Sequence, residues 1–112
     1  MNRGEIWLVN LDTTIDSEVK KTRPAVIISS DLVGILPLKI VVPFTDWKDR
    51  YSSAAWMVRI EPDHQNGLNK ISAADGLQVR SISHQRLVKR LGGLTKMQVA
   101  QIVQAVVNVL QR

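Results

Sequence analysis

Apolar residues in this chain fall into short runs separated by polar segments, and no run approaches the ~18 residues that a membrane-spanning helix needs. β-branched and aromatic residues are frequent in these runs, which is typical of strands. The chain of 112 residues has room for one modest core, so we expect a single domain over residues 1–112 and no membrane segment. The pattern predicts strands over residues 5–11, 24–29, 38–44, 55–60, 77–82 and 86–91.

One segment near the C-terminus departs from this pattern. Thr95 is a suitable N-cap, and Gln98 three residues later completes a capping box. From Val99 to Leu110, apolar residues recur at helical spacing opposite a stripe of Gln and Asn. The wide apolar face can pack on the core or against a second copy of the chain. We therefore expect a mainly β fold, a small barrel or curled sheet, capped by this helix.

The positive charge of the chain is unevenly distributed. The formal net charge is +5, and no acidic residue follows Asp75. Such a distribution suits binding to nucleic acid through release of counterions, although a solvated basic face has the same composition. The basic residues after Asp75 are Arg80, Arg86, Lys89, Arg90, Lys96 and Arg112.

Several kinds of site are excluded by composition. The chain has no Cys, so a disulfide framework, a thiolate metal site and a Cys nucleophile are impossible. It also lacks the glycine-rich phosphate-binding loops and the HExxH zinc signature. Carboxylates in the 12–18 loop are accompanied by Lys20, Lys21 and Arg23, so we expect no metal and no cofactor. The N-terminus shows no export signal, and we expect a cytoplasmic protein.

The segment from Ser17 to Pro24 is the most informative for chemistry. Pro24 disfavours helical backbone at Arg23, so the arginine enters the next strand in an extended conformation. Its planar fork of donors suits a phosphodiester better than a lysine does. The alternative is a salt bridge to Glu18 or Asp16.

A second segment surrounds the end of the 38–44 strand. Pro43, late in an apolar run, indicates an edge or a bulge, and Thr45 then projects from the strand end. Structural hydrogen bonding is the default role of such a threonine. Trp47, with Lys48 and Arg50 close by, is typical of a platform on which bases stack, or of an aromatic folded back onto the sheet.

Together these segments carry a family resemblance. In order and spacing, they resemble the MazF/PemK (Kid) toxins of type II toxin–antitoxin systems, over roughly residues 3 to 110. Asp16 departs from the glycine that usually stands there. The matching segments are residues 3–9 (RGEIWLV), 17–18 (SE), 23–26 (RPAV), 42–45 (VPFT), 75–81 (DGLQVRS) and 86–92 (RLVKRLG).

The resemblance implies an SH3-like small β-barrel of the CcdB/MazF type with a C-terminal helix. It also implies a homodimer, a cognate antitoxin with which the toxin binds DNA, and growth inhibition in a bacterial cytoplasm. The implied activity is that of an endoribonuclease (mRNA interferase), which cleaves single-stranded RNA at short sequences by metal-independent attack of the 2′-hydroxyl. The family's catalytic residues correspond to Arg23, Thr45 and Glu18, and the residues expected to bind substrate are Lys20, Lys21, Trp47, Lys48, Arg50, Gln78 and Arg80.

Two other functions fit the same fold and charge. A CcdB-like toxin would bind DNA gyrase, an activity associated with an aromatic residue near the C-terminus. Here the three tryptophans are Trp7, Trp47 and Trp56, far from that end. A non-catalytic module that binds RNA or the ribosome would keep the basic surface without cleavage.

Overall fold

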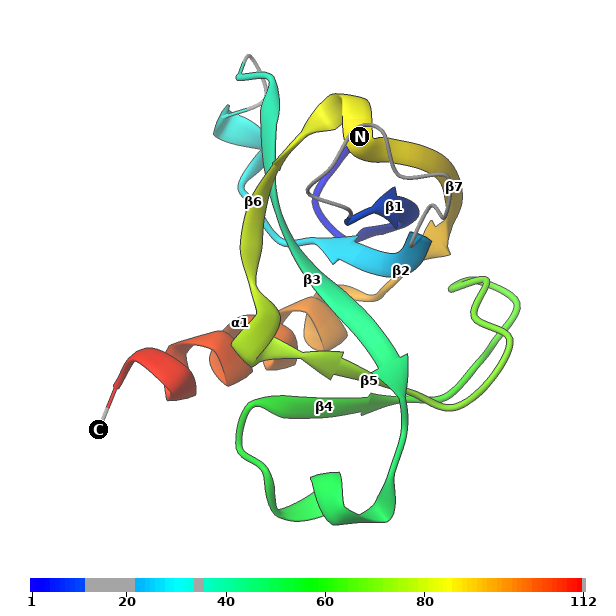
Figure 1. Ribbon diagram of the computed structural model, residues 1–112, viewed down its shortest axis with the longest axis vertical. Helices are drawn as coiled ribbons and strands as arrows, with labels where there is room; N and C mark the ends of the chain where they lie inside the picture. The colour runs from blue at the N-terminus through cyan, green and yellow to red at the C-terminus, as the bar shows by residue number, and fades with distance from the viewer. Residues whose placement is uncertain (12–21, 34–35, 112) are drawn as a thin grey trace.

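The computed structural model describes residues 1–11, 22–33 and 36–111, and in these ranges it shows seven strands and one α-helix (Figure 1). Four short 3₁₀ helices connect the strands. The strands are β1 (Glu5–Asn10), β2 (Thr22–Ile27), β3 (Leu38–Asp46), β4 (Met57–Ile60), β5 (Ser72–Asp75), β6 (Arg80–Ser83) and β7 (Leu87–Gly93). The helices are η1 (Asp31–Val33), η2 (Asp49–Ser53), η3 (Gly76–Gln78), η4 (His84–Arg86) and α1 (Lys96–Leu110).

All strand pairs are antiparallel, in the order β4-β5-β3-β2-β1-β7, and β6 pairs with the first part of β3. Figure 1 shows β3 running from the β1–β2 layer to the β4–β5 pair. The mainly β class and the terminal helix are confirmed. Within the described residues the edge strands β4 and β7 do not pair, so the sheet curls without closing into a barrel.

Both faces of the central strands are buried, as their continuous apolar runs predicted. On one face Val26 and Val42, which are paired in register, pack with Ile102 of α1. On the other face Ile27 and Val41 belong to a second cluster with residues from β1, β6 and β7. The curl of the sheet therefore encloses one core, and α1 covers the other.

The predicted start of α1 is confirmed. The Gln98 backbone N–H donates to Thr95 Oγ1 at 3.1 Å, and the Thr95 N–H donates to Gln98 Oε1 at 2.9 Å, which completes the capping box. Val99 and Ile102 face the core, and the Gln and Asn stripe faces solvent. Neither α1 nor any other helix of the described ranges is long and apolar enough to cross a membrane.

Asn66 and Gly67 lie in the connection from β4 to β5. Gly67 has φ +69°, which favours glycine. Asn66 is fully buried, and its Oδ1 accepts from the Leu68 N–H at 3.0 Å while its Nδ2 donates to the Glu61 carbonyl at 2.9 Å. The Asn66 side chain therefore forms hydrogen bonds with backbone groups of the loop, where strand pairing does not satisfy them.

The strand expected over residues 77–82 is corrected by the structure. Residues 76–78 form η3, and β6 begins only at Arg80. The Asp75 carboxylate accepts from the Leu77 N–H at 3.1 Å and thereby caps this turn. Strand β5, at Ser72–Asp75, was not predicted, because Ser, Ala and Asp are poor strand formers.

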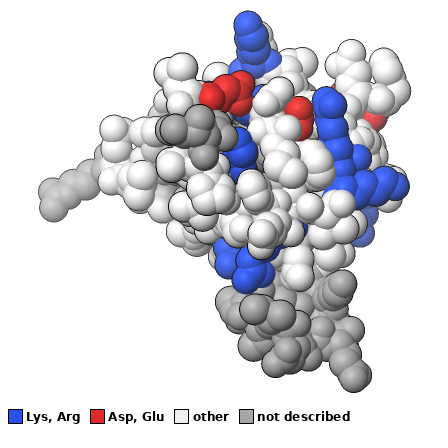
Figure 2. Space-filling view, turned by 90° about the horizontal axis from the view of Figure 1, so that it is seen from above, with Lys and Arg blue, Asp and Glu red and all other residues white. Residues whose placement is uncertain are grey.

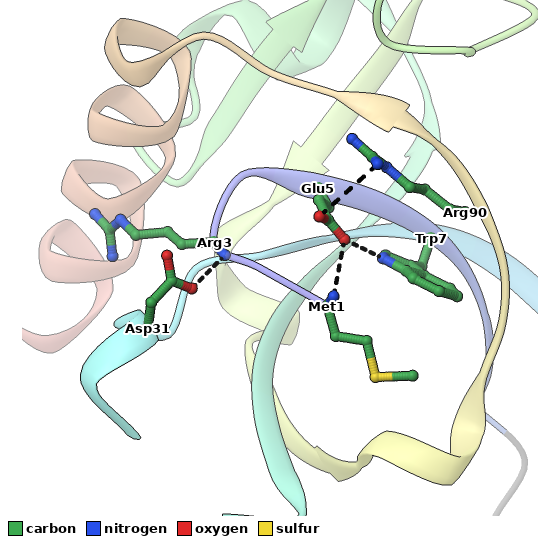
Figure 3. A network of polar contacts seen from close by, with 6 residues as sticks. All are labelled: Met1, Arg3, Glu5, Trp7, Asp31 and Arg90. Atoms are coloured by element: carbon green, nitrogen blue, oxygen red, sulfur yellow. Dashed lines mark hydrogen bonds and ion pairs between the residues drawn. The ribbon is translucent and has the colours of Figure 1, made fainter. Parts of the chain in front are cut away.

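A polar network around Glu5 joins the N-terminus to β1 and β7 (Figure 3). The Trp7 indole N–H donates to Glu5 Oε1 at 2.9 Å, the terminal ammonium lies 3.3 Å from the same oxygen, and Arg90 lies 4.0 Å from Oε2. Burial alone raises the pKa of Glu5, but the Trp7 hydrogen bond, the backbone of Asn2 and the terminal ammonium together lower it below its ordinary value. The ionised carboxylate is therefore the form that stabilises the fold.

This depressed pKa predicts a pH-dependent contribution to stability. At pH 7 Glu5→Gln should lower the free energy of unfolding by about 1 kcal/mol, because it removes a charge that accepts a partly buried hydrogen bond. The difference from wild type should shrink as pH falls from about 5 through the folded pKa, since the wild-type carboxylate is then protonated. Urea denaturation at pH 7 and pH 3 measures this, with the exposed Glu61→Gln as a matched control. An equal deficit at both pH values would contradict the assignment.

Candidate active site

Arg23 lies at the start of β2, where the curled sheet opens toward solvent. Its side chain is exposed, and its backbone pairs with Val9 of β1, which is fully buried. The extended conformation predicted from Pro24 is observed. Among the described residues no acidic group forms an ion pair with Arg23. The side chain is exposed beside the second core, and its two alternative partners, Asp16 and Glu18, lie outside the described residues.

Thr45 lies near the end of β3 and is half-buried. Strand β3 pairs with β6 as far as Val41 and with β5 from Phe44 onward. Pro43, which has no N–H to donate, lies where β3 changes neighbours, and its pairing with Ala25 of β2 continues without a bulge. On the side away from β2, neither Val42 nor Pro43 appears in the pairings with β6 and β5, so the proline lies at a local edge, as the sequence indicated, and no bulge interrupts the pairing with β2.

The register of β2 and β3 places Arg23 and Thr45 on one face. Their last ladder pair is Ala25 with Pro43. Arg23 is two residues before Ala25 and Thr45 two residues after Pro43, and side chains two residues apart on a strand share a face. The two functional groups leave the same face at neighbouring strand ends, just beyond the last pair.

Trp47 is the first residue after β3, two positions beyond Thr45. Its backbone N–H donates to the Ile71 carbonyl at 3.1 Å, which continues the pairing with β5. The ring is half-buried and meets Tyr51 at 6.0 Å between centroids, with the ring planes at 77°. Arg59 of β4 lies over the indole at 5.7 Å from its centroid. Sequence reasoning did not include Arg59 or Tyr51, and only the strand register and the η2 turn bring them to Trp47.

The other predicted substrate-binding residues are dispersed. Lys48 and Arg50 are exposed in the connection after β3, and Arg50 lies over the Tyr51 ring at 5.4 Å. Arg80 is half-buried and pairs with Val41, which lies four residues before Thr45 on β3. Arg80 therefore leaves the same face of the sheet as Thr45. Gln78 is exposed at the end of η3. The predicted residues Glu18, Lys20 and Lys21, and Asp16, lie outside the described residues.

The surface charge around the N-terminal layer is basic but not concentrated in one patch. Figure 2 shows Lys and Arg at several separate places on this face, with fewer Asp and Glu among them. Part of the positive charge is already paired, since Lys70 Nζ lies 2.9 Å from Asp46. Such a surface attracts a polyanion over a broad area. Local groups must then determine where on the surface the polyanion binds.

Fold and site together define a class: a small curled-sheet protein that offers an exposed arginine and a hydroxyl on one face, beside a basic loop with an aromatic ring. The model of the family described as "PemK-like, MazF-like toxin of type II toxin-antitoxin system" matches residues 2–110. The chain belongs to this family, as its sequence segments predicted.

Known relatives agree with this assignment. The chain is 31% identical to Endoribonuclease MazF9 of Mycobacterium tuberculosis over 111 residues, which are 94% of this chain and 92% of the relative. It is 37% identical to Endoribonuclease PemK of Escherichia coli over 62 residues, which are 54% of this chain and 47% of the relative. Both names support the endoribonuclease class that the sequence predicted.

Solved structures match the fold. The Mycobacterium tuberculosis toxin MazF-mt6 superposes with a TM-score of 0.74 at 25% identity, and 95% of each chain is covered. The MazF chain in a MazE-MazF structure (Form-III) from Deinococcus radiodurans matches with a TM-score of 0.74 over 98% of this chain and 95% of that chain. At 19% identity, the similarity to the Deinococcus radiodurans structure shows a shared fold alone.

Proposed function

We propose that this toxin cleaves single-stranded RNA at short sequences, without a metal, at a site built from Arg23 and Thr45. The observation that carries the proposal is their placement on one face at neighbouring strand ends, with the guanidinium exposed and the hydroxyl half-buried. A phosphodiester that lies across these strand ends can receive donors from both side chains.

The reaction follows from these groups. The 2′-oxygen of the substrate attacks the adjacent phosphorus, the bond to the 5′-oxygen of the next nucleotide breaks, and the products are a 2′,3′-cyclic phosphate and a 5′-hydroxyl. Arg23 neutralises the charge that develops on the phosphorane, and Thr45 donates to a non-bridging oxygen. Arginine is a poor base because its guanidinium stays protonated, so Glu18 or a water takes the 2′ proton, and the departing 5′-oxygen takes up a proton from water.

The remaining predicted residues hold the strand. Trp47 offers a ring for a base, and Lys48, Arg50 and Arg80 are cations near the same face. We assign Gln78, together with Lys20 and Lys21, to substrate binding as well. Because RNA is the substrate, the toxin acts in the bacterial cytoplasm.

The proposal includes two protein partners. A cognate antitoxin neutralises the toxin, as the family description and the MazE-MazF structures support. Toxin and antitoxin together bind DNA. A second copy of the chain forms a homodimer. Exposed apolar side chains near the end of α1 support this pairing, since Trp56, Leu77 and Val109 line a hollow of about 250 Å³ and Leu110 is 77% exposed.

A substrate with one altered sugar tests the chemistry. We expect purified toxin to cut a labelled RNA oligonucleotide in excess EDTA and to leave a 2′,3′-cyclic phosphate. A single 2′-deoxy nucleotide 5′ of the cleaved bond should abolish that cut, because the nucleophile is missing. Binding without cleavage of the all-RNA oligonucleotide would support the non-catalytic module. Cleavage of the 2′-deoxy oligonucleotide at the same bond would contradict the proposed nucleophile.

A further inference from the structure

Three strands place Thr45 and Arg59 in one row. Ala73 of β5 pairs with Thr45 of β3 on one side and with Arg59 of β4 on the other. Residues directly opposite in antiparallel strands share a face, so all three side chains leave the same side of the sheet. Strands lie about 4.8 Å apart, so the Thr45 and Arg59 backbones are separated by roughly 10 Å. Ala73, the residue between them in the row, is fully buried, so the accessible part of this row lies at the Thr45 and Arg59 ends.

Trp47 lies beside this row and is held by its neighbours. It is two residues beyond Thr45, and its N–H bond to the Ile71 carbonyl extends the pairing of β3 with β5 by one residue. Tyr51 meets the indole edge to face, and the Arg59 guanidinium lies over it at 5.7 Å. These contacts orient the ring before any ligand arrives, which reduces the entropy that binding costs.

Arg59 is itself oriented and remains accessible. Its guanidinium lies 3.4 Å from the Glu61 carboxylate, and its side chain is 49% exposed. An arginine in this position has donors to spare, because its planar fork carries five N–H groups. A flat base that approaches Trp47 therefore meets an aromatic face together with a guanidinium.

From this juxtaposition we infer that Trp47 and Arg59 form a nucleotide subsite next to the scissile phosphate. The subsite takes the unstacked base of the nucleotide beside the cleaved bond. That base stacks on the indole, and Arg59 packs against it and donates to its edge. The inference rests on the proposed function for the position of the phosphate at Thr45. Arg59 is accordingly a positioning residue for the substrate and takes no part in bond cleavage.

The experiment measures binding separately from cleavage. The probe is a fluorescent RNA oligonucleotide with one 2′-deoxy nucleotide at the mapped cleavage site, and anisotropy gives its Kd. Arg59→Ala and Trp47→Ala should each raise the Kd about tenfold. Arg59→Lys should remain nearly as weak as Arg59→Ala, because a lysine keeps the charge but lacks the planar fork. Lys96→Ala, which removes an exposed cation in the first turn of α1, is the matched control and should leave the Kd almost unchanged.

An abasic probe identifies the base. Removing the base beside the cleavage site should raise the Kd for wild type about tenfold. For Trp47→Ala the abasic and intact probes should have nearly the same Kd, because the stacking partner is already absent. Wild-type Kd values for Arg59→Ala or Arg59→Lys would overturn the inference, as would equal losses for Lys96→Ala. Cleavage of the 2′-deoxy probe at the mapped bond, with the Arg59 and Trp47 effects on Kd intact, would refute the proposed chemistry and leave the subsite standing.

Discussion

Arg23→Ala is expected to lower the rate of RNA cleavage by about 10² to 10³-fold, the usual cost of removing one preorganised donor from a transition state. The fold should survive, since the Arg23 side chain is exposed. Single-turnover cleavage of a labelled oligonucleotide at saturating toxin measures the chemical step. Circular dichroism and the midpoint of thermal unfolding measure the fold on the same samples.

Two further variants show whether the loss comes from the transition state. Arg23→Lys keeps the charge but loses the fork of donors, so its rate should lie between those of wild type and Arg23→Ala. Thr45→Val keeps the volume and removes the hydroxyl, and it should slow the same step. An Arg23→Ala protein that cleaves at the wild-type rate would remove the basis of the proposed active site.

Gly92→Ala is expected to lower the free energy of unfolding by about 3 kcal/mol, the upper range for forcing atoms into a packed site. A Cβ at Gly92 would lie 2.2 Å from the Gln65 carbonyl oxygen and 2.6 Å from the Asn66 carbonyl carbon. Both are backbone atoms of the loop that packs on β7, and the Gly93 N–H donates to that same Gln65 oxygen at 2.9 Å. The loop must therefore move and loses its attachment.

The neighbouring glycine provides the control. A Cβ at Gly93 would meet its nearest atom, the Gly4 carbonyl oxygen, at an ordinary 3.5 Å. Gly93→Ala should therefore stay within about 1 kcal/mol of wild type. Urea denaturation of the two variants side by side measures the difference. Equal stability of the two would show that the 65–66 loop does not pack against β7 as described.

Local signals in the sequence predicted much of the fold. The capping box of Thr95 and Gln98 and the extended backbone at Arg23 depend on residues close together in the chain, and both are observed. The strand itself begins at Thr22, two residues earlier than predicted. Strand β5 had no such signal. Its Ala73 and Ala74 are fully buried between neighbouring strands. Small residues suit this packed position, but their low strand propensity gives no signal of a strand in the sequence.

The same distinction between local sequence signals and tertiary pairing applies to the residues of the candidate site. Arg23 directly precedes Pro24, and Thr45 follows Pro43 by two residues. Both residues could be identified as candidates from the sequence because these two proline-containing segments resemble those of the family. Arg59 could not, since a lone arginine in the 55–60 strand has no local feature that distinguishes it. Its position opposite Ala73, in one row with Thr45, arises from pairing between segments far apart in the chain.

The sequence by itself therefore determined the family, the helix start and the extended backbone at Arg23, because these depend on residues close together in the chain. Only the tertiary structure decided which side chains share a face, where β3 exchanges β6 for β5, and that the sheet stays open. Those features depend on strand register, which is set by many small packing contacts between distant residues.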